Sequence, residues 1–171
     1  MFIDESGLHL AMARSHVWVK KGTEYIERFP MIWGRNNLTL LGAIRVTGWV
    51  VLSSMFQTAN ADRFVLWLKK KLLPKLRRGD VLVMDNLKAH HDERVRPACR
   101  AFGVRAIYLP PYSPDLNPIE PGWALQKQHV RKHAPRQAGD LRRVARRARY
   151  RVTPRHCRRW FEHAGYLVQP K

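Results

Sequence analysis

A run of four apolar residues, Val81 to Met84, stops abruptly at a carboxylate, Asp85. A short run without polar side chains is typical of a strand that is buried on both faces, as in the sheets of α/β proteins. The residue after such a strand lies at the carboxyl edge of the sheet, where these proteins build their sites. The run therefore predicts an α/β fold with Asp85 at a functional edge.

Further strand and helix signals flank this run. Strands are predicted at 1–3, leading into Asp4, at 38–46 and 49–56 as a pair around Thr47 and Gly48, and at 104–109. Helices are predicted from a cap at Asn60 to about Leu72, over 95–102, from Pro118 toward Lys132, over 141–148 and, after a cap at Thr153, over 154–164. This order indicates one mixed-sheet α/β domain over residues 1–171 with a helical C-terminal side.

The chain is strongly basic, with 32 Lys and Arg against 13 Asp and Glu and a formal net charge of +19. Nucleic acid is the expected partner, because basic side chains on phosphates release condensed counterions. Between Lys127 and Arg159 there is one acidic residue, Asp140, so a merely solvated, internally paired helix face is the weaker interpretation. The residues expected to contact DNA there are Lys127, Arg131, Lys132, Arg142, Arg143, Arg146 and Arg147.

Several classes of protein are excluded by the sequence. Cys99 and Cys157 form no CxxC pair, which argues against a zinc site or a disulfide framework. No apolar run approaches the roughly 20 residues of a membrane span. The N-terminus has no basic stretch before an apolar one, as a signal peptide would. We therefore expect a cytoplasmic protein.

Three carboxylates stand out on this basic chain. Asp4 follows the first predicted strand as Asp85 follows the later one. Glu120 stands at the start of a helix, with 34 residues between it and Asp85. Two neighbouring parallel strands would bring the aspartates together, which is unfavourable unless a cation joins them. Oxygen ligands favour Mg²⁺ or Mn²⁺. Three carboxylates that share two such ions are suited to phosphoryl transfer.

Each candidate also has a purely structural interpretation. Glu120 comes three residues after Asn117, as in a capping box. Asp4 would be a surface residue near a terminus, and Asp85 with Asn86 would form an ordinary turn. His90 and Asn86 are candidate DNA contacts, with a structural role as the alternative. The combination of three carboxylates on a basic chain favours a metal site.

Three segments resemble the catalytic motifs of mariner-superfamily transposases, specifically of the bacterial insertion-sequence branch: FIDESGL, VLVMDNLKAHH and YLPPYSPDLNPIEPGW. The resemblance implies a ribonuclease-H-like fold, similar to retroviral integrases, with a mixed five-stranded sheet flanked by helices. It also implies cut-and-paste movement of DNA with two Mg²⁺ or Mn²⁺ ions, catalysed by Asp4, Asp85 and Glu120. A homodimer on double-stranded DNA, at the element ends and the target in a bacterial nucleoid, is expected on the same basis.

The sequence departs from the family pattern at three places. Only three residues precede Asp4, so the family's N-terminal helix-turn-helix region is expected to be absent and to come from a separate or frameshifted polypeptide. Trp123 is followed by Ala124 where the family has serine, and Pro97 is expected to delay the start of its helix. A non-catalytic, truncated DNA-binding remnant is therefore the alternative. A ribonuclease H is disfavoured by the proline-rich segment before Glu120.

Overall fold

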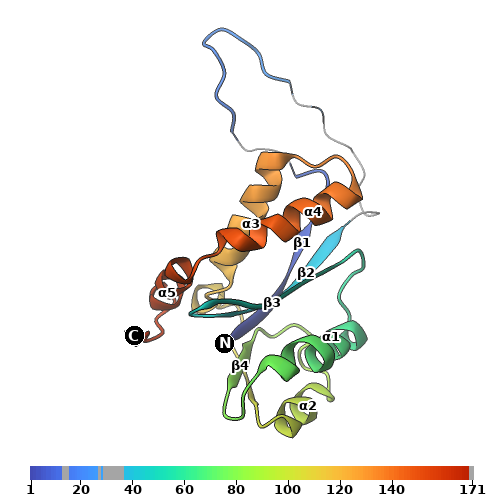
Figure 1. The fold of residues 1–171 in the computed structure, drawn as a ribbon, viewed down its shortest axis with the longest axis vertical. Coiled ribbons are helices and arrows are strands. Elements are labelled where there is room, and N and C mark those ends of the chain that lie inside the picture. Colours follow the sequence, from blue (N-terminus) through green and yellow to red (C-terminus); the bar gives the residue numbers. More distant parts are fainter. Residues whose placement is uncertain (13–15, 27, 29–36, 170–171) are drawn as a thin grey trace.

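The computed structural model of the protein describes residues 1–12, 16–26, 28 and 37–169. Its centre is a five-stranded sheet with the strand order β3-β2-β1-β4-β5 (Figure 1). β1 is antiparallel to β2 and β2 to β3, whereas β4 is parallel to both β1 and β5. The sheet is therefore mixed, as predicted. The bounds are β1 Phe2–Leu8, β2 Leu38–Arg45, β3 Gly48–Met55, β4 Val81–Met84 and β5 Arg105–Tyr108.

Helices cover both faces of this sheet (Figure 1). One face carries α1 (Ala61–Trp67), which continues through a π-helical turn and a 3-10 turn to Lys75, and α2 (Val95–Ala101). The other face carries α3 (Glu120–His133), α4 (Ala138–Ala148) and α5 (Pro154–His163). In Figure 1 the segment 16–26, between β1 and β2, extends away from this body.

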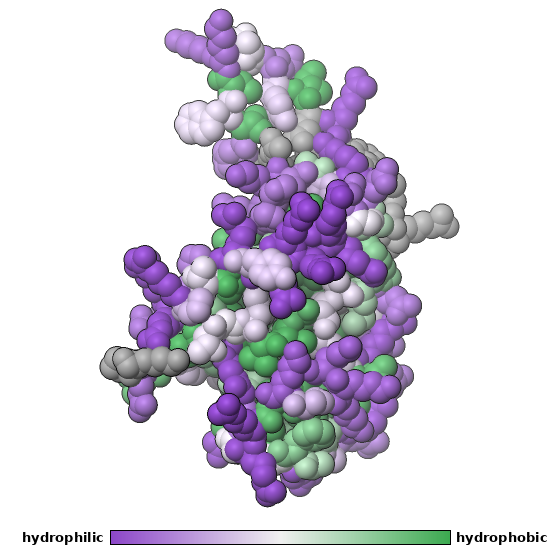
Figure 2. All heavy atoms as spheres, viewed as in Figure 1, coloured by the Kyte–Doolittle hydropathy of each residue, from purple (hydrophilic) through white to green (hydrophobic). Residues whose placement is uncertain are grey.

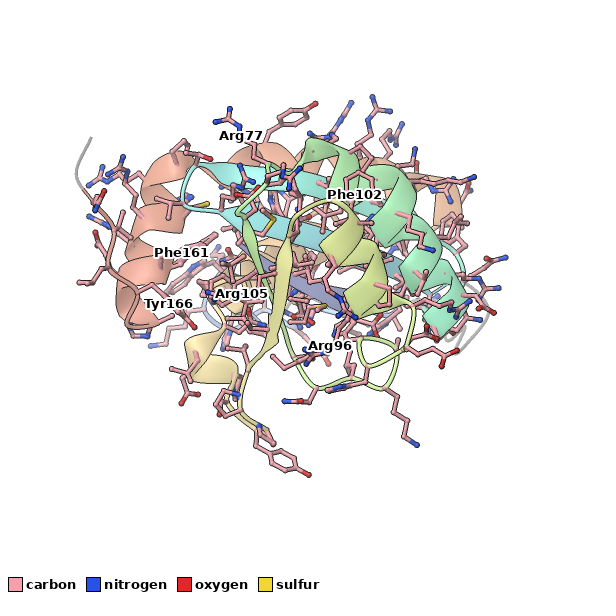
Figure 3. All side chains as sticks on the ribbon, turned by 90° about the horizontal axis from the view of Figure 1, so that it is seen from below. Arg77, Arg96, Phe102, Arg105, Phe161 and Tyr166 are labelled. Carbon is pink, nitrogen blue, oxygen red and sulfur yellow. The ribbon has the colours of Figure 1, made fainter. Side chains whose placement is uncertain are left out.

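The side chains along each strand point alternately to the two faces of the sheet, and this separates two hydrophobic cores. Ile3 and Leu41 pack with the α1 and α2 side, whereas their neighbours Phe2 and Leu40 pack with the α3, α4 and α5 side. Successive residues of a strand point to opposite faces, so each strand contributes to both layers. On the side of α3, α4 and α5, the ring centroid of Phe2 lies 5.4 Å from that of Phe161 and 4.8 Å from that of Tyr166. Phe161 and Tyr166 are labelled in Figure 3.

Two predicted helix caps are confirmed. The amide of Arg63 donates to Oδ1 of Asn60 at 3.0 Å at the start of α1. At α5, Thr153 accepts from the amide of His156, and the two residues form a reciprocal capping box. These caps are local, because each satisfies a helix amide from a side chain three residues away.

Three predicted boundaries are wrong. β1 continues through Asp4 to Leu8, because β2 pairs with it over its whole length. Pro97 does not delay α2; it lies in the first turn, where a missing N–H breaks no helical bond. Asn117 does not cap α3, which begins at Glu120 without any side-chain cap, so the capping-box interpretation of Glu120 is also wrong.

Within the described residues, none of the helices has the length and apolar character needed to cross a membrane. Cys99 and Cys157 are both free and buried.

Candidate metal-dependent active site

The parallel pairing of β1 and β4 brings the two candidate aspartates together. Phe2 pairs with Val83, so two residues further along Asp4 lies beside Asp85. β4 ends at Met84, which puts Asp85 at the carboxyl edge of the sheet. Asp4 reaches the same level from inside a longer strand, opposite Gly42 of β2. The prediction that the two strands are parallel neighbours is confirmed.

Asp4 is a buried carboxylate, only 7% exposed. Its Oδ2 accepts from the indole Nε1 of Trp123 at 2.9 Å, and its Oδ1 accepts from the amide of Glu5 at 2.7 Å. Burial raises the pKa of Asp4 to about 7; the two hydrogen bonds oppose this shift, and the negative charges of Glu120 and Asp85 add to it. A neighbouring cation would relieve this unfavourable charge.

The pKa of Asp85 is shifted in the opposite direction from that of Asp4. Burial favours its neutral form, but hydrogen bonds from His90 and Leu87, together with the charges of His90 and His91, outweigh burial and leave the pKa of Asp85 below its ordinary value. Its Oδ1 lies 2.6 Å from Nδ1 of His90 and 3.2 Å from the amide of Leu87. The carboxylate is thus ionised at neutral pH, with Oδ1 held and the side chain still 35% exposed.

Glu120 is exposed on the first turn of α3, one turn before Trp123. Its charge contributes to the raised pKa of Asp4, so the two carboxylates are electrostatic neighbours. Among the described residues, no three histidine, cysteine or acidic side chains lie close enough together to hold one ion. The three carboxylates are therefore brought to one edge of the sheet without closing around a common point.

A model of the family described as "DDE superfamily endonuclease" matches residues 1–142. The chain belongs to this family. The DDE endonuclease chain is 29% identical over 133 residues to the transposable element Tc1 transposase of Caenorhabditis elegans, which covers 70% of this chain and 47% of that protein. It therefore spans about half the length of that relative.

Solved structures agree on the fold of this DDE endonuclease domain. The Mos1 mariner paired-end complex with Mn matches with a TM-score of 0.64 at 16% identity, over 94% of this chain and 51% of that chain. The catalytic domain of Mos1 mariner transposase matches with a TM-score of 0.56 at 13% identity, over 98% and 83% of the two chains. The predicted ribonuclease-H-like fold is confirmed.

The predicted DNA contacts of the DDE domain fall into two groups. His90 has no exposed surface, and its ring packs against Phe64 at 4.4 Å, so a DNA contact by this side chain is wrong. Asn86 is exposed, but its amide donates to the carbonyl of Leu109 and its Oδ1 lies 3.0 Å from Nε2 of His91. Asn86 thus holds the loop after β4 to the end of β5.

The predicted basic residues line the surface of α3 and α4. Lys127 is half-buried, and the other six are exposed. Hydrophilic side chains gather over α4 in Figure 2. Arg142 lies over the ring of Phe56 at 4.4 Å, and Arg143 pairs with Asp140 at 2.6 Å. The surface is thus available to a polyanion on the same side of the sheet as α3.

Two residues of the site were missed by sequence reasoning. Trp123 was assigned only to its helix, yet its N–H contacts Asp4. Gly42 leaves the space for this contact, since a Cβ there would lie 2.6 Å from Cη2 of Trp123. Both contacts join segments far apart in the chain, and no local pattern signals them.

Proposed function

We propose that this chain is the catalytic part of a DNA transposase of the mariner superfamily, bacterial insertion-sequence branch. It would cleave and join DNA strands with two Mg²⁺ or Mn²⁺ ions held by Asp4, Asp85 and Glu120. One observation carries the proposal: at the positions of the family motifs, Asp4 of β1 lies beside Asp85 at the end of β4, and the charges of Asp85 and of Glu120 on α3 add to burial in raising the pKa of Asp4.

The donor set fits a hard divalent cation. All three candidate ligands are carboxylates, the type that Mg²⁺ and Mn²⁺ prefer. Asp4 is held firmly, whereas Asp85 has one oxygen without a hydrogen bond in the described part, and Glu120 is exposed with no hydrogen bond or ion pair there. Bound ions would activate a water or a 3′-hydroxyl and stabilise the leaving oxygen.

The protein's own residues would supply DNA binding and charge balance. The exposed arginines of α4 would bind phosphates, and Asp85 would stay ionised through its bond with His90. The names of the Mos1 relatives describe complexes with a transposon end and a strand-transfer complex. By that likeness, we propose double-stranded DNA at element ends and target as the substrate. On the resemblance of the motifs, we propose a homodimer as the active form, in the cytoplasm at the bacterial nucleoid. On the family pattern alone, a helix-turn-helix polypeptide would recognise the ends.

A matched pair of glutamate variants tests catalysis. With Mn²⁺ and a supercoiled plasmid, the wild-type chain is expected to nick DNA, and Glu120→Gln is expected to lose at least about a hundredfold in rate, as when a group acting in the transition state is removed. Glu162→Gln, which changes an exposed glutamate on α5 that is not a proposed ligand, is expected to keep the wild-type rate. Equal rates in both variants would refute the proposal.

A second candidate is a non-catalytic DNA-binding remnant. It is favoured by the observation that no three side chains of the described residues close around one ion. This alternative predicts DNA binding that weakens steeply with salt and no nicking by the wild-type chain in Mn²⁺ or Mg²⁺. The plasmid assay above therefore separates the two candidates.

A further inference from the structure

We propose that Trp123 is a positioning residue for the metal site, an inference that rests on the proposed function of that site. Its indole N–H fixes the direction of the Asp4 carboxylate, and its ring holds the start of α3, with Glu120, against the sheet. One aromatic side chain thereby determines the placement of two of the three carboxylates.

The contact between Trp123 and Asp4 is short and buried. Trp123 is 1% exposed, and its Nε1 lies 2.9 Å from Oδ2 of Asp4. The amide of Glu5 binds the other oxygen at 2.7 Å. Each oxygen keeps one lone pair for a further ligand, and neither is able to swing away without losing a bond that buried surroundings do not replace with water. The carboxylate is therefore pre-oriented before any ion arrives.

The position of the Trp123 indole ring depends on Gly42, because a glycine has no Cβ to occupy the space above the strand. Gly42 lies directly opposite Asp4 on β2. A Cβ on Gly42 would lie 2.6 Å from Cη2 of Trp123 and 2.8 Å from Cζ3 of Trp49, so both rings occupy the space above this glycine. The two rings contact each other with centroids 5.1 Å apart. Confined between Gly42 and Trp49, the indole of Trp123 has its N–H directed at Asp4.

Trp49 shows that packing alone does not require an indole N–H here. Its Nε1 is buried in the same cluster and finds no hydrogen-bond partner among the described residues. The indole N–H of Trp123 bonds Asp4, whereas that of Trp49 has no partner among the described residues. Trp49 therefore only fills space in the cluster, and Trp123 also orients the Asp4 carboxylate. Glu120 and Trp123 are three residues apart on α3 and share a helix face, so a shift of the ring moves the carboxylate too.

Two matched variants of the whole chain test the inference by metal binding. Trp123→Phe keeps an aromatic ring and removes the bonded N–H, and Trp49→Phe removes an N–H that has no hydrogen-bond partner in the described part of the chain. We expect Mn²⁺ affinity, measured by titration calorimetry, to fall about ten- to a hundredfold in Trp123→Phe and to fall clearly less in Trp49→Phe, which loosens the packing around Trp123 but keeps its N–H. Thermal unfolding checks that both variants are folded. Equal Mn²⁺ affinity in the two variants would overturn the inference.

A metal-free measurement keeps this test separate from the proposed function. In ¹H–¹⁵N spectra of the chain in EDTA, Asp4→Ala is expected to move the indole resonance of Trp123 upfield and speed its hydrogen exchange, with a smaller effect on Trp49. An unchanged Trp123 resonance would overturn the inference. If the resonance moves but the wild type binds no Mn²⁺, the bond stands and the proposed metal site is refuted.

Discussion

Adjacent aspartates at the same sheet edge have pKa values shifted in opposite directions. Asp4 is enclosed, so burial raises its pKa to about 7 despite two hydrogen bonds. Asp85 is only half-buried, and its contact with His90 outweighs the effect of burial and lowers its pKa. The environment of each carboxylate, and not its chemical type, decides its charge. Without a cation, the edge carries less negative charge near neutral pH than three carboxylates would suggest.

The raised pKa of Asp4 predicts a pH-dependent stability of the metal-free chain. The folded state holds a proton that the unfolded state, with a pKa of 3.8, releases. This contribution is fully present below pH 3.8 and is lost as the pH rises through about 7. Asp4→Asn removes it, so the wild type is expected to lose stability relative to the variant between pH 4 and 8, by on the order of a few kcal/mol.

Urea denaturation in EDTA at several pH values measures this difference. The other titrating groups, including Glu5 with its own raised pKa, are common to both proteins and cancel in the comparison. Parallel stability curves for wild type and Asp4→Asn would contradict the assignment of Asp4 as a buried, protonatable carboxylate.

At the scale of elements, the site depends on how β1, β2 and α3 fit together. β2 pairs along all of β1 and thereby extends the strand beyond Asp4. Gly42 in β2 lets α3 approach close enough for Trp123 to reach that carboxylate. Two of the proposed ligands, Asp4 and Glu120, are thus held by one antiparallel strand pair and one helix, whereas Asp85 follows β4.

Gly42→Ala is expected to disturb this fit. The new methyl group would overlap the rings of Trp123 and Trp49, and overpacking of this kind costs about 1–3 kcal/mol. We expect a lower free energy of unfolding and weaker Mn²⁺ binding, measured by urea denaturation and calorimetry. Gly7→Ala is the matched control, because a Cβ at Gly7 of β1 meets nothing within 4 Å. If Gly42→Ala and Gly7→Ala have the same free energy of unfolding and the same Mn²⁺ affinity, the close approach of the Trp123 ring to Gly42 does not matter for the site.

Over the whole molecule, the candidate carboxylates lie apart from the exposed arginines of α4. The candidate carboxylates lie at the carboxyl edge of β1 and β4, whereas exposed arginines cover α4. A chain with a net charge of +19 attracts polyanions from a distance, and under the proposed function this arrangement would direct DNA phosphates to the α3 and α4 side.

Removing two arginines of α4 is expected to weaken DNA binding at every sequence. Arg146→Gln with Arg147→Gln would lower the slope of log affinity against log salt by about two, one for each lost phosphate contact. Arg77→Gln with Arg105→Gln is the matched control, because these residues lie before β4 and at the start of β5, away from the carboxyl edge (Figure 3). Titrations of fluorescent duplex DNA at several salt concentrations measure both slopes. An equal decrease of the slope in the two double variants would show that DNA does not bind specifically at α4.

The sequence by itself determined the features that depend on near neighbours. The apolar run 81–84 predicted a buried strand ending at Asp85, and Asn60 and Thr153 predicted the starts of α1 and α5, because hydrophobic alternation and capping act over a few residues. The resemblance of the three motif segments supplied the ribonuclease-H-like fold, which the solved relatives confirm.

Only the tertiary structure decided what depends on distant partners. The length of β1 follows from its pairing with β2, and the burial of His90 follows from its packing against Phe64. The bond from Trp123 to Asp4 joins residues 119 positions apart. Such contacts leave no periodic trace in the chain, because they arise from the shape of the packed core and not from the preferences of adjacent residues.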